Sequence, residues 1–102
     1  MLIIQKLSRM IKEEIGDAEK YANCALKYKE EDKALADVFY TLSTEELKHM
    51  EMLHAQVTRI INEYKAKKGA PPEGMQAIYN YVHEEEMENV KEVKILQSMY
   101  KG

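Results

Sequence analysis

The sequence predicts an all-α protein built from an antiparallel hairpin of two long helices and a third helix. Three observations favour this class. Apolar residues recur at steps of three and four, as they do on one face of a helix. Four glycines and two prolines are the only helix-breaking residues in 102, and most of them cluster in residues 69–74. A short polar segment, residues 29–33, divides the remaining periodic sequence into two helices.

The first helix is expected over about residues 3–28. Its apolar face is interrupted by one carboxylate, Glu14, and otherwise consists of Leu7, Ile11, Ala18, Tyr21, Ala25 and Tyr28, widened by Ile4, Ile15 and Ala22. Cys24 is the single cysteine, which excludes an intramolecular disulfide and a paired-cysteine metal clip. It is expected to pack as a small apolar residue.

The second helix is expected over about residues 32–68, with Asp32 as its N-cap. Because the connection before it is short, the two helices should pack antiparallel. A helix of this length spans roughly 50 Å, which is more than a small lone domain needs and favours a partner chain. Its expected apolar stripe consists of Leu35, Val38, Phe39, Leu42, Leu53, Ile60 and Tyr64.

The third helix is expected over about residues 73–100, after Gly69 ends the second helix and two prolines precede the new one. Its expected apolar stripe consists of Ile78, Val82, Val90, Val93, Leu96 and Tyr100. Residues 83–88 are mostly charged and interrupt that stripe. Residues 1–102 are expected to form one domain.

Glu46 and His49 are the most informative pair in the sequence. They lie three residues apart, and therefore on the same helical face, between Leu42 and Leu53. A carboxylate on an apolar face is costly unless a charge, hydrogen bonds or a metal ion compensates. Glu14 interrupts the preceding helix in the same way, so the sequence predicts a metal site between the two helices. Two carboxylates and an imidazole suit iron, manganese or zinc better than calcium.

These residues resemble half of the metal site in the ferritin-like di-iron carboxylate proteins. That superfamily combines a Glu from each of two helices with a Glu-x-x-His from each of two others. The resemblance covers about residues 1–65, and Tyr21 is similar to the tyrosine near the metals of rubrerythrin-like members. It implies Fe(II) oxidation, with Glu46 as a bridging ligand, Glu14 and His49 as terminal ligands, and Tyr21 steadying the site by hydrogen bonding.

The sequence also departs from that family. It has no second Glu-x-x-His and none of the cysteine pairs of full rubrerythrins, so it is closer to the half-length encapsulated ferritins. That resemblance implies a homodimer, or a higher homo-oligomer, that completes a ferritin-like four-helix bundle, with the site shared between subunits. Doubling the set gives four carboxylates and two imidazoles, enough for two ions. Residues 97–102 do not resemble an encapsulin-targeting peptide, so an encapsulating shell does not carry over.

The sequence is compatible with other sites and functions. His83, Glu85 and Glu86 could complete the site within one chain, although a charge run of this kind is usually solvated. His54 lies about 80° around the helix from Glu46 and is expected to be exposed. The rival functional class is a non-enzymatic oligomerisation module, in which the polar residues only fix helix register. A third reading is a ferritin-like fold that holds manganese or zinc without turnover.

Composition excludes several other classes. The formal net charge is −3 and no basic stripe stands apart from acidic neighbours, so nucleic acid is not an expected partner. No stretch is apolar enough for a signal peptide or a membrane-spanning helix. The expected location is the cytoplasm, or a compartment loaded from it.

Overall fold

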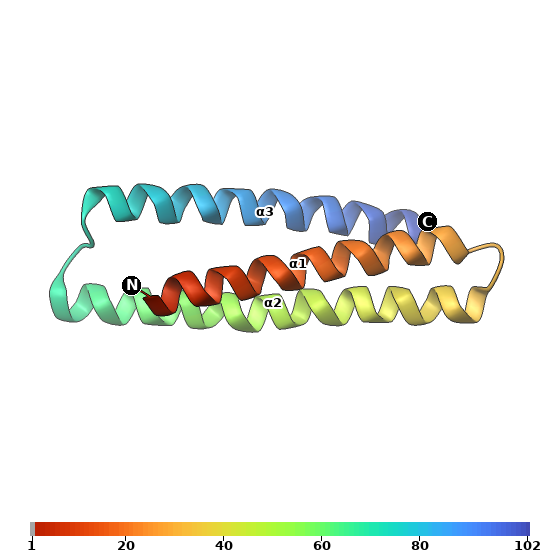
Figure 1. The fold of residues 1–102 in the computed structure, drawn as a ribbon, viewed down its shortest axis with the longest axis horizontal. Helices are drawn as coiled ribbons and strands as arrows, with labels where there is room; N and C mark the ends of the chain where they lie inside the picture. The colour runs from red at the N-terminus through yellow and green to blue at the C-terminus, as the bar shows by residue number, and fades with distance from the viewer. Residues whose placement is uncertain (1) are drawn as a thin grey trace.

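The protein consists of three long helices in a computed structural model that describes residues 2–102 (Figure 1). They are α1 (Leu2–Tyr28), α2 (Lys33–Lys68) and α3 (Glu73–Lys101). α1 and α2 form an antiparallel hairpin, and α3 returns along the bundle in the same direction as α1. The predicted all-α class and hairpin are confirmed, and each helix boundary lies within one residue of its expected position. The bundle is elongated, with extents of 55 × 19 × 18 Å.

Local signals in the sequence set the ends of α2. Asp32 caps its N-terminus, as expected, because the Asp32 carboxylate accepts a hydrogen bond of 3.1 Å from the backbone N–H of Leu35. At the other end, Gly69 adopts a φ of 79° and its N–H donates to the Lys65 carbonyl at 3.0 Å. A residue without a Cβ adopts this left-handed conformation at little cost, which explains why the helix stops there.

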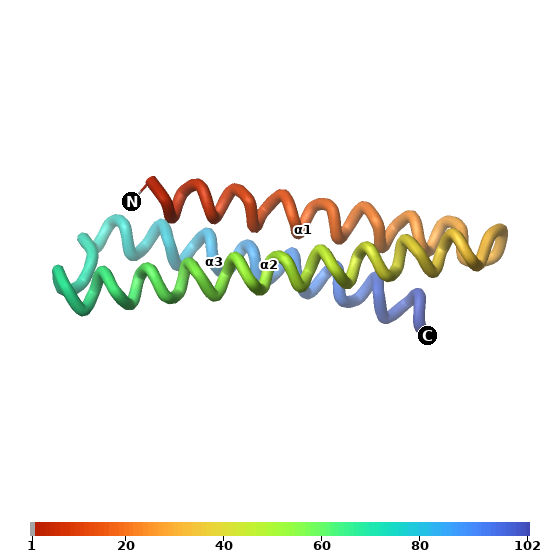
Figure 2. The backbone as a smooth tube through the Cα atoms, turned by 90° about the horizontal axis from the view of Figure 1, so that it is seen from below, coloured from red at the N-terminus to blue at the C-terminus, as the bar shows by residue number. Residues whose placement is uncertain are grey.

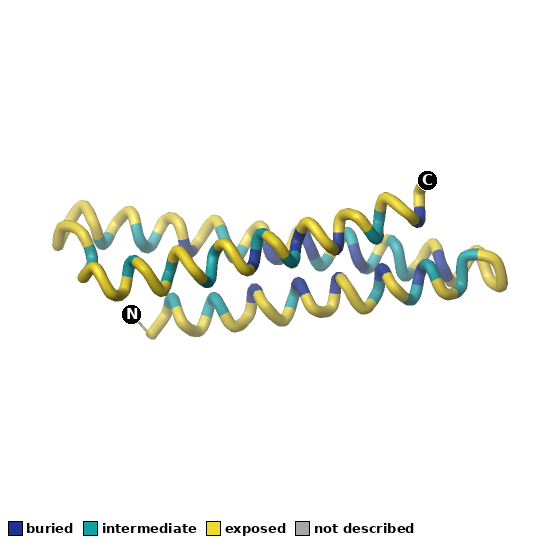
Figure 3. The backbone as a smooth tube through the Cα atoms, turned by 90° about the horizontal axis from the view of Figure 1, so that it is seen from above, coloured by how far each residue is buried: buried dark blue, intermediate teal, exposed yellow. Residues whose placement is uncertain are grey.

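The core lies along the inner sides of all three helices (Figure 3). Its largest cluster of buried side chains comprises Ile11, Ile15, Ala18, Leu47, Met50, Val57, Val90 and Val93. Ser43 joins the three helices within this interior. Its hydroxyl donates to the Ala18 carbonyl at 2.7 Å and accepts from the Gln97 amide at 2.9 Å. Burial of Ser43 is therefore compensated by hydrogen bonds to both neighbouring helices.

The buried stripe of α2 differs from the expected one. Leu35 and Val38, predicted as core, are 38 % and 54 % exposed, whereas the buried residues of α2 are Ala36, Ser43, Leu47, Met50 and Val57. The reason is that α2 carries apolar residues on two adjacent faces, and only one of them turns toward α3. Ile78 of α3, also predicted as core, is exposed as well. Periodicity alone could not choose between neighbouring faces of a broadly apolar helix.

α3 covers only one side of the α1–α2 hairpin. The contacts that join α2 to α3 include the stacked rings of Tyr40 and Tyr100, the imidazoles of His54 and His83, and the Ser43–Gln97 hydrogen bond. The Tyr100 hydroxyl also donates a hydrogen bond to the Asp37 carboxylate of α2. Figure 2 shows α1 along one edge of the bundle, whereas in the view of Figure 1 α2 and α3 lie on either side of α1. The side of the hairpin away from α3 is uncovered.

We call this uncovered side of the hairpin the open face. It contains the exposed apolar residues Ile3, Met10, Leu35 and Val38. Each of three of these residues lies eleven positions, or about three turns, before a polar residue on the same helix and so shares a helical face with it. The pairs are Ile3 with Glu14, Leu35 with Glu46, and Val38 with His49. The polar residues therefore interrupt an apolar surface, as predicted, but that surface borders the core instead of lying within it. Among residues 2–102, no helix is long and apolar enough to cross a membrane.

Candidate metal centre

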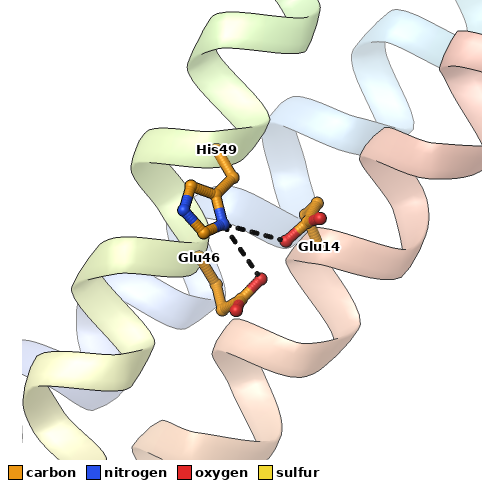
Figure 4. A group of neighbouring side chains, drawn as sticks. All are labelled: Glu14, Glu46 and His49. Atoms are coloured by element: carbon orange, nitrogen blue, oxygen red, sulfur yellow. Dashed lines mark ion pairs between the residues drawn. The ribbon is translucent and has the colours of Figure 1, made fainter.

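Glu14, Glu46 and His49 converge at the seam between α1 and α2 (Figure 4). The His49 Nδ1 atom lies 3.6 Å from the Glu14 Oε2 atom and 3.7 Å from the Glu46 Oε2 atom. One ligand atom from each residue lies within 4.8 Å of the other two. Two donor atoms on a metal ion bound at about 2.1 Å can be separated by up to about 4.2 Å, so the His49 nitrogen is close enough to either carboxylate oxygen to share one ion with it.

The hairpin itself creates this convergence. Glu46 and His49 share a face of α2 because they are three residues apart, and the antiparallel packing brings α1 alongside with Glu14 at the same level. The polar turn at residues 29–32 and the Asp32 cap fix where α2 starts and so contribute to the register between the helices. No segment of irregular backbone is needed to build the group.

The two carboxylates are largely withdrawn from water, whereas the imidazole is not. The exposed fractions of the side chains are 27 % for Glu14, 18 % for Glu46 and 54 % for His49. The sequence predicted that all three side chains are withdrawn from water in an apolar seam. The half-exposed side chain of His49 differs from that prediction. It arises because the group lies on the open face, with α3 on the other side of the hairpin (Figure 4).

The surroundings of the Glu14 Oε2 atom indicate whether a cation fits between Glu14, Glu46 and His49. It is buried and has no hydrogen-bond partner. Across the described helices, no Lys or Arg forms an ion pair with Glu14 or Glu46. A buried carboxylate oxygen without a donor is unfavourable, and a metal ion between the three side chains would supply the missing positive charge. The donor set therefore fits a divalent transition metal.

Tyr21 lies two turns after Glu14 on α1, and its ring stacks on Phe39 with centroids 6.3 Å apart. Within residues 2–102, no hydrogen bond links its hydroxyl to Glu14, Glu46 or His49. Its expected role beside the metals stays a prediction. The Phe39 contact does place Tyr21 at the α1–α2 seam.

The α3 candidates lie elsewhere in the bundle. The group of ligand atoms that converges contains neither His83, Glu85 nor Glu86. The expectation that residues 84–86 form a solvated run is wrong for Glu86, which is only 7 % exposed, while Glu84 and Glu85 are exposed. Burial raises the pKa of Glu86 to about 7, and the like charge of Glu85 adds to this shift. The Glu86 Oε1 atom is also buried without a hydrogen-bond partner.

His54 is half-buried instead of exposed. Its Nε2 atom lies 3.1 Å from the Nδ1 atom of His83 on α3, and the two rings stack with centroids 4.9 Å apart. Burial, with a smaller effect from His83, lowers the pKa of His54. This pair was not predicted, because the apolar stripe expected on α2 did not include His54. A stripe drawn through Met50 and Val57, the residues that are buried, would have included His54.

No protein-family model, curated protein or solved structure matched this chain. The resemblance to ferritin-like proteins therefore rests only on the residue pattern of this sequence. What the structure shows is an all-helical protein in which a Glu/Glu/His group could hold a metal ion.

Proposed function

We propose that this protein is a ferritin-like iron-binding protein that oxidises Fe(II) to Fe(III) at Glu14, Glu46 and His49. The observation that carries this proposal is the convergence of two carboxylates and an imidazole from two helices, with the Glu14 Oε2 atom buried and without a hydrogen-bond partner. In this reading iron is the substrate, and dioxygen or peroxide accepts the electron that each Fe(II) loses.

The residues supply binding and electrostatics for that reaction. Carboxylate oxygens favour the Fe(III) product over Fe(II), because a hard cation prefers hard donors. The imidazole of His49, half in solvent, lies at the outer edge of the group and gives iron a route from water. The low exposure of the Glu46 carboxylate strengthens its attraction for a cation, since less water competes for it.

A second copy of the chain is the proposed partner. One copy offers two carboxylates and one imidazole, which are too few ligands for two ions, and a two-fold axis doubles the set. The open face has the form that such contact requires, with the polar group in the middle and exposed apolar residues toward the ends of the hairpin: Ile3 and Met10 on α1, Leu35 and Val38 on α2. Two hairpins joined by this face would form a four-helix bundle around the two polar groups.

The test is aerobic Fe(II) oxidation, followed by the rise of Fe(III) absorbance after mixing with anaerobically prepared iron. Glu46→Ala and His49→Ala are expected to reduce the protein-dependent rate to the buffer background, while circular dichroism shows unchanged helicity. Glu45→Ala removes an exposed carboxylate from the adjacent position of α2 and should leave the rate unchanged. Wild-type rates in both Glu46→Ala and His49→Ala would refute the proposal.

Metal analysis separates this proposal from the two alternatives. Untagged protein, purified without a nickel column, should take up about two irons per dimer and gain thermal stability from the metal. Tight manganese or zinc binding without Fe(II) turnover would favour a non-redox metal site. Absence of any metal binding would favour an oligomerisation module, in which a protonated His49 simply pairs with Glu14 and Glu46.

A further inference from the structure

A groove runs along the seam between α1 and α3. The two helices lie parallel, so their residues meet in sequence order along this seam (Figure 1). Two adjoining cavities, of about 320 and about 250 Å³, make up the groove, and Ser8 of α1 and Val82 of α3 line both of them. Ligand pockets in proteins usually have volumes of about 300 Å³ or more, so the groove is large enough for a small organic molecule.

The stretch of the groove nearer the N-termini of α1 and α3 is apolar. Its lining includes Ile4 of α1, Ile61 and Tyr64 of α2, and Met75 and Ile78 of α3. Met75 and Ile78 are 43 % and 68 % exposed. Apolar surface that stays in contact with water is unfavourable. Gathered around a groove, it is typical of a site that takes up a hydrocarbon group.

The adjoining stretch of the groove is polar. Its lining includes Arg9 and Lys12 of α1 and Glu85, Glu86 and Asn89 of α3. Arg9 and Lys12 are three residues apart and so share one face of α1. Within residues 2–102, neither of them forms an ion pair with a carboxylate. Both positive charges are therefore available to an anion that enters the groove.

Glu86 is the buried polar side chain of this stretch. It is only 7 % exposed, and its Oε1 atom has no hydrogen-bond partner. Burial and the like charge of Glu85 raise the pKa of Glu86 to about 7, so the carboxyl binds a proton near neutral pH. Of the other charged groups that line this stretch, Arg9 and Lys12 belong to α1 and Glu85 to α3, and none belongs to α2. A protonated carboxyl can donate a hydrogen bond to an anionic oxygen in the groove.

We propose that this groove binds an amphipathic monocarboxylate of the fatty-acid type, with its hydrocarbon chain along the apolar stretch and its carboxylate between Arg9 and Lys12. A purely apolar ligand would leave the two basic side chains without an anion, and a small hydrophilic anion would leave the apolar stretch in water. The groove follows the α1–α3 seam, whereas Glu14, Glu46 and His49 lie at the α1–α2 seam. The proposed binding is therefore independent of iron oxidation.

A chain-length series tests whether the hydrocarbon chain is buried. Straight-chain carboxylates from hexanoate to dodecanoate, each below its micelle concentration, are titrated into the protein by calorimetry. Affinity should rise about threefold to fourfold for each added methylene. Ile78→Glu places a charge in the apolar stretch at an exposed position and should weaken dodecanoate binding at least about tenfold. An affinity that does not depend on chain length would overturn the proposal.

The basic end is tested with the double variant Arg9→Gln/Lys12→Gln. Dodecanoate should bind at least about tenfold more weakly to it than to the wild type, because two charge-assisted contacts are lost. Dodecanol, which has the same chain without the charge, should bind both proteins equally within about twofold. Lys6→Gln, an exposed basic residue of α1 outside the groove, is the matched control and should change dodecanoate affinity by less than about twofold. Equal weakening by the control would assign the effect to overall charge and contradict the proposal.

The pH dependence tests the position of the carboxylate beside Glu86. Dodecanoate affinity should fall as the pH rises through about 7, because Glu86 then loses its proton and repels the ligand. Glu86→Gln keeps a hydrogen-bond donor that does not titrate and should bind without this dependence. Wild-type binding that is independent of pH would place the carboxylate elsewhere.

Backbone NMR locates the ligand in the wild-type chain, without relying on any variant. Added dodecanoate should shift the amide signals of Ser8 and Val82, which lie where the two stretches meet. The signals of Glu14, Glu46 and His49 should stay in place, and the rate of Fe(II) oxidation should not change. Shifts that leave out both Ser8 and Val82 would overturn the proposal and leave the proposed iron site unaffected.

Discussion

At the scale of single residues, this protein places acidic side chains where water cannot fully solvate them. Glu14 and Glu86 each have a buried carboxylate oxygen without a hydrogen-bond partner. Glu14 has an imidazole and a second carboxylate beside it. Glu86 lines a groove between α1 and α3 that Arg9 and Lys12 also line. Such positions are unfavourable for folding and are typical of sites that bind ions or protons. Their effect should be visible in how stability responds to pH and to metal.

Glu86 should make the metal-free protein less stable as the pH rises. Its folded-state pKa is about 7, raised from an ordinary value of 4.5, so the folded protein holds the proton more tightly than the unfolded chain. The contribution of protonated Glu86 to the free energy of unfolding is therefore fully present below pH 4.5. It is lost as the pH rises through the window from 4.5 to about 7. Glu86→Gln should remove this dependence, which corresponds to about 1–3 kcal/mol.

The measurement is urea unfolding with chelator present, at several pH values across that window. As the pH rises, the unfolding free energy of Glu86→Gln should increase relative to that of the wild type. Glu84→Gln should follow the wild-type pH dependence, because Glu84 is exposed. Parallel curves for Glu86→Gln and wild type would show that the carboxyl titrates normally.

At the scale of helices, the sequence predicted most of the fold because its local signals agree with one another. The polar turn and the Asp32 cap determine where α2 begins, and Gly69 determines where it ends. Glu14, Glu46 and His49 were found for a similar reason. Residues three apart on a helix must share a face, and a short connection must bring α1 alongside α2.

The choice of buried face could not be predicted in the same way. Leu35 and Val38 were expected in the core, yet α2 turns Ala36 and Ser43 inward. Which face is buried depends on where α3 packs, and that is decided by long-range contacts such as Ser43 with Gln97 and Tyr40 with Tyr100. The same error hid the burial of Glu86 and the pairing of His54 with His83. Charge runs and isolated histidines carry no periodic signal that shows which neighbour they face.

At the scale of the whole molecule, α3 covers one side of the hairpin and leaves the Glu14–Glu46–His49 group on the other. This arrangement accounts for the intermediate exposure of Glu14 and Glu46 and for the exposed apolar residues beside them. Pairing of two copies through the open face would bury those residues and bring two Glu/Glu/His groups together. The proposed activity and the proposed dimer therefore depend on the same surface.

Val38→Glu tests that dependence. Val38 is exposed on the open face, so a charge there should not disturb the helical fold, but it should oppose contact between two open faces. Size-exclusion chromatography with light scattering should change from dimer to monomer, and Fe(II) oxidation should fall at least about tenfold, consistent with a loss of more than about 1.4 kcal/mol. Ile95→Glu, which changes an exposed apolar residue of α3, should retain both the dimer and the activity. A monomeric Val38→Glu protein with full activity would separate the site from the dimer.

Anomalous X-ray diffraction from crystals soaked with iron locates the metal directly and independently of activity. We expect an iron peak within about 2.0–2.2 Å of carboxylate oxygens from Glu14 and Glu46 and a ring nitrogen of His49. A second such peak should lie close by, across a two-fold axis. An iron-soaked crystal in which those three side chains bind no metal would contradict the proposed iron site.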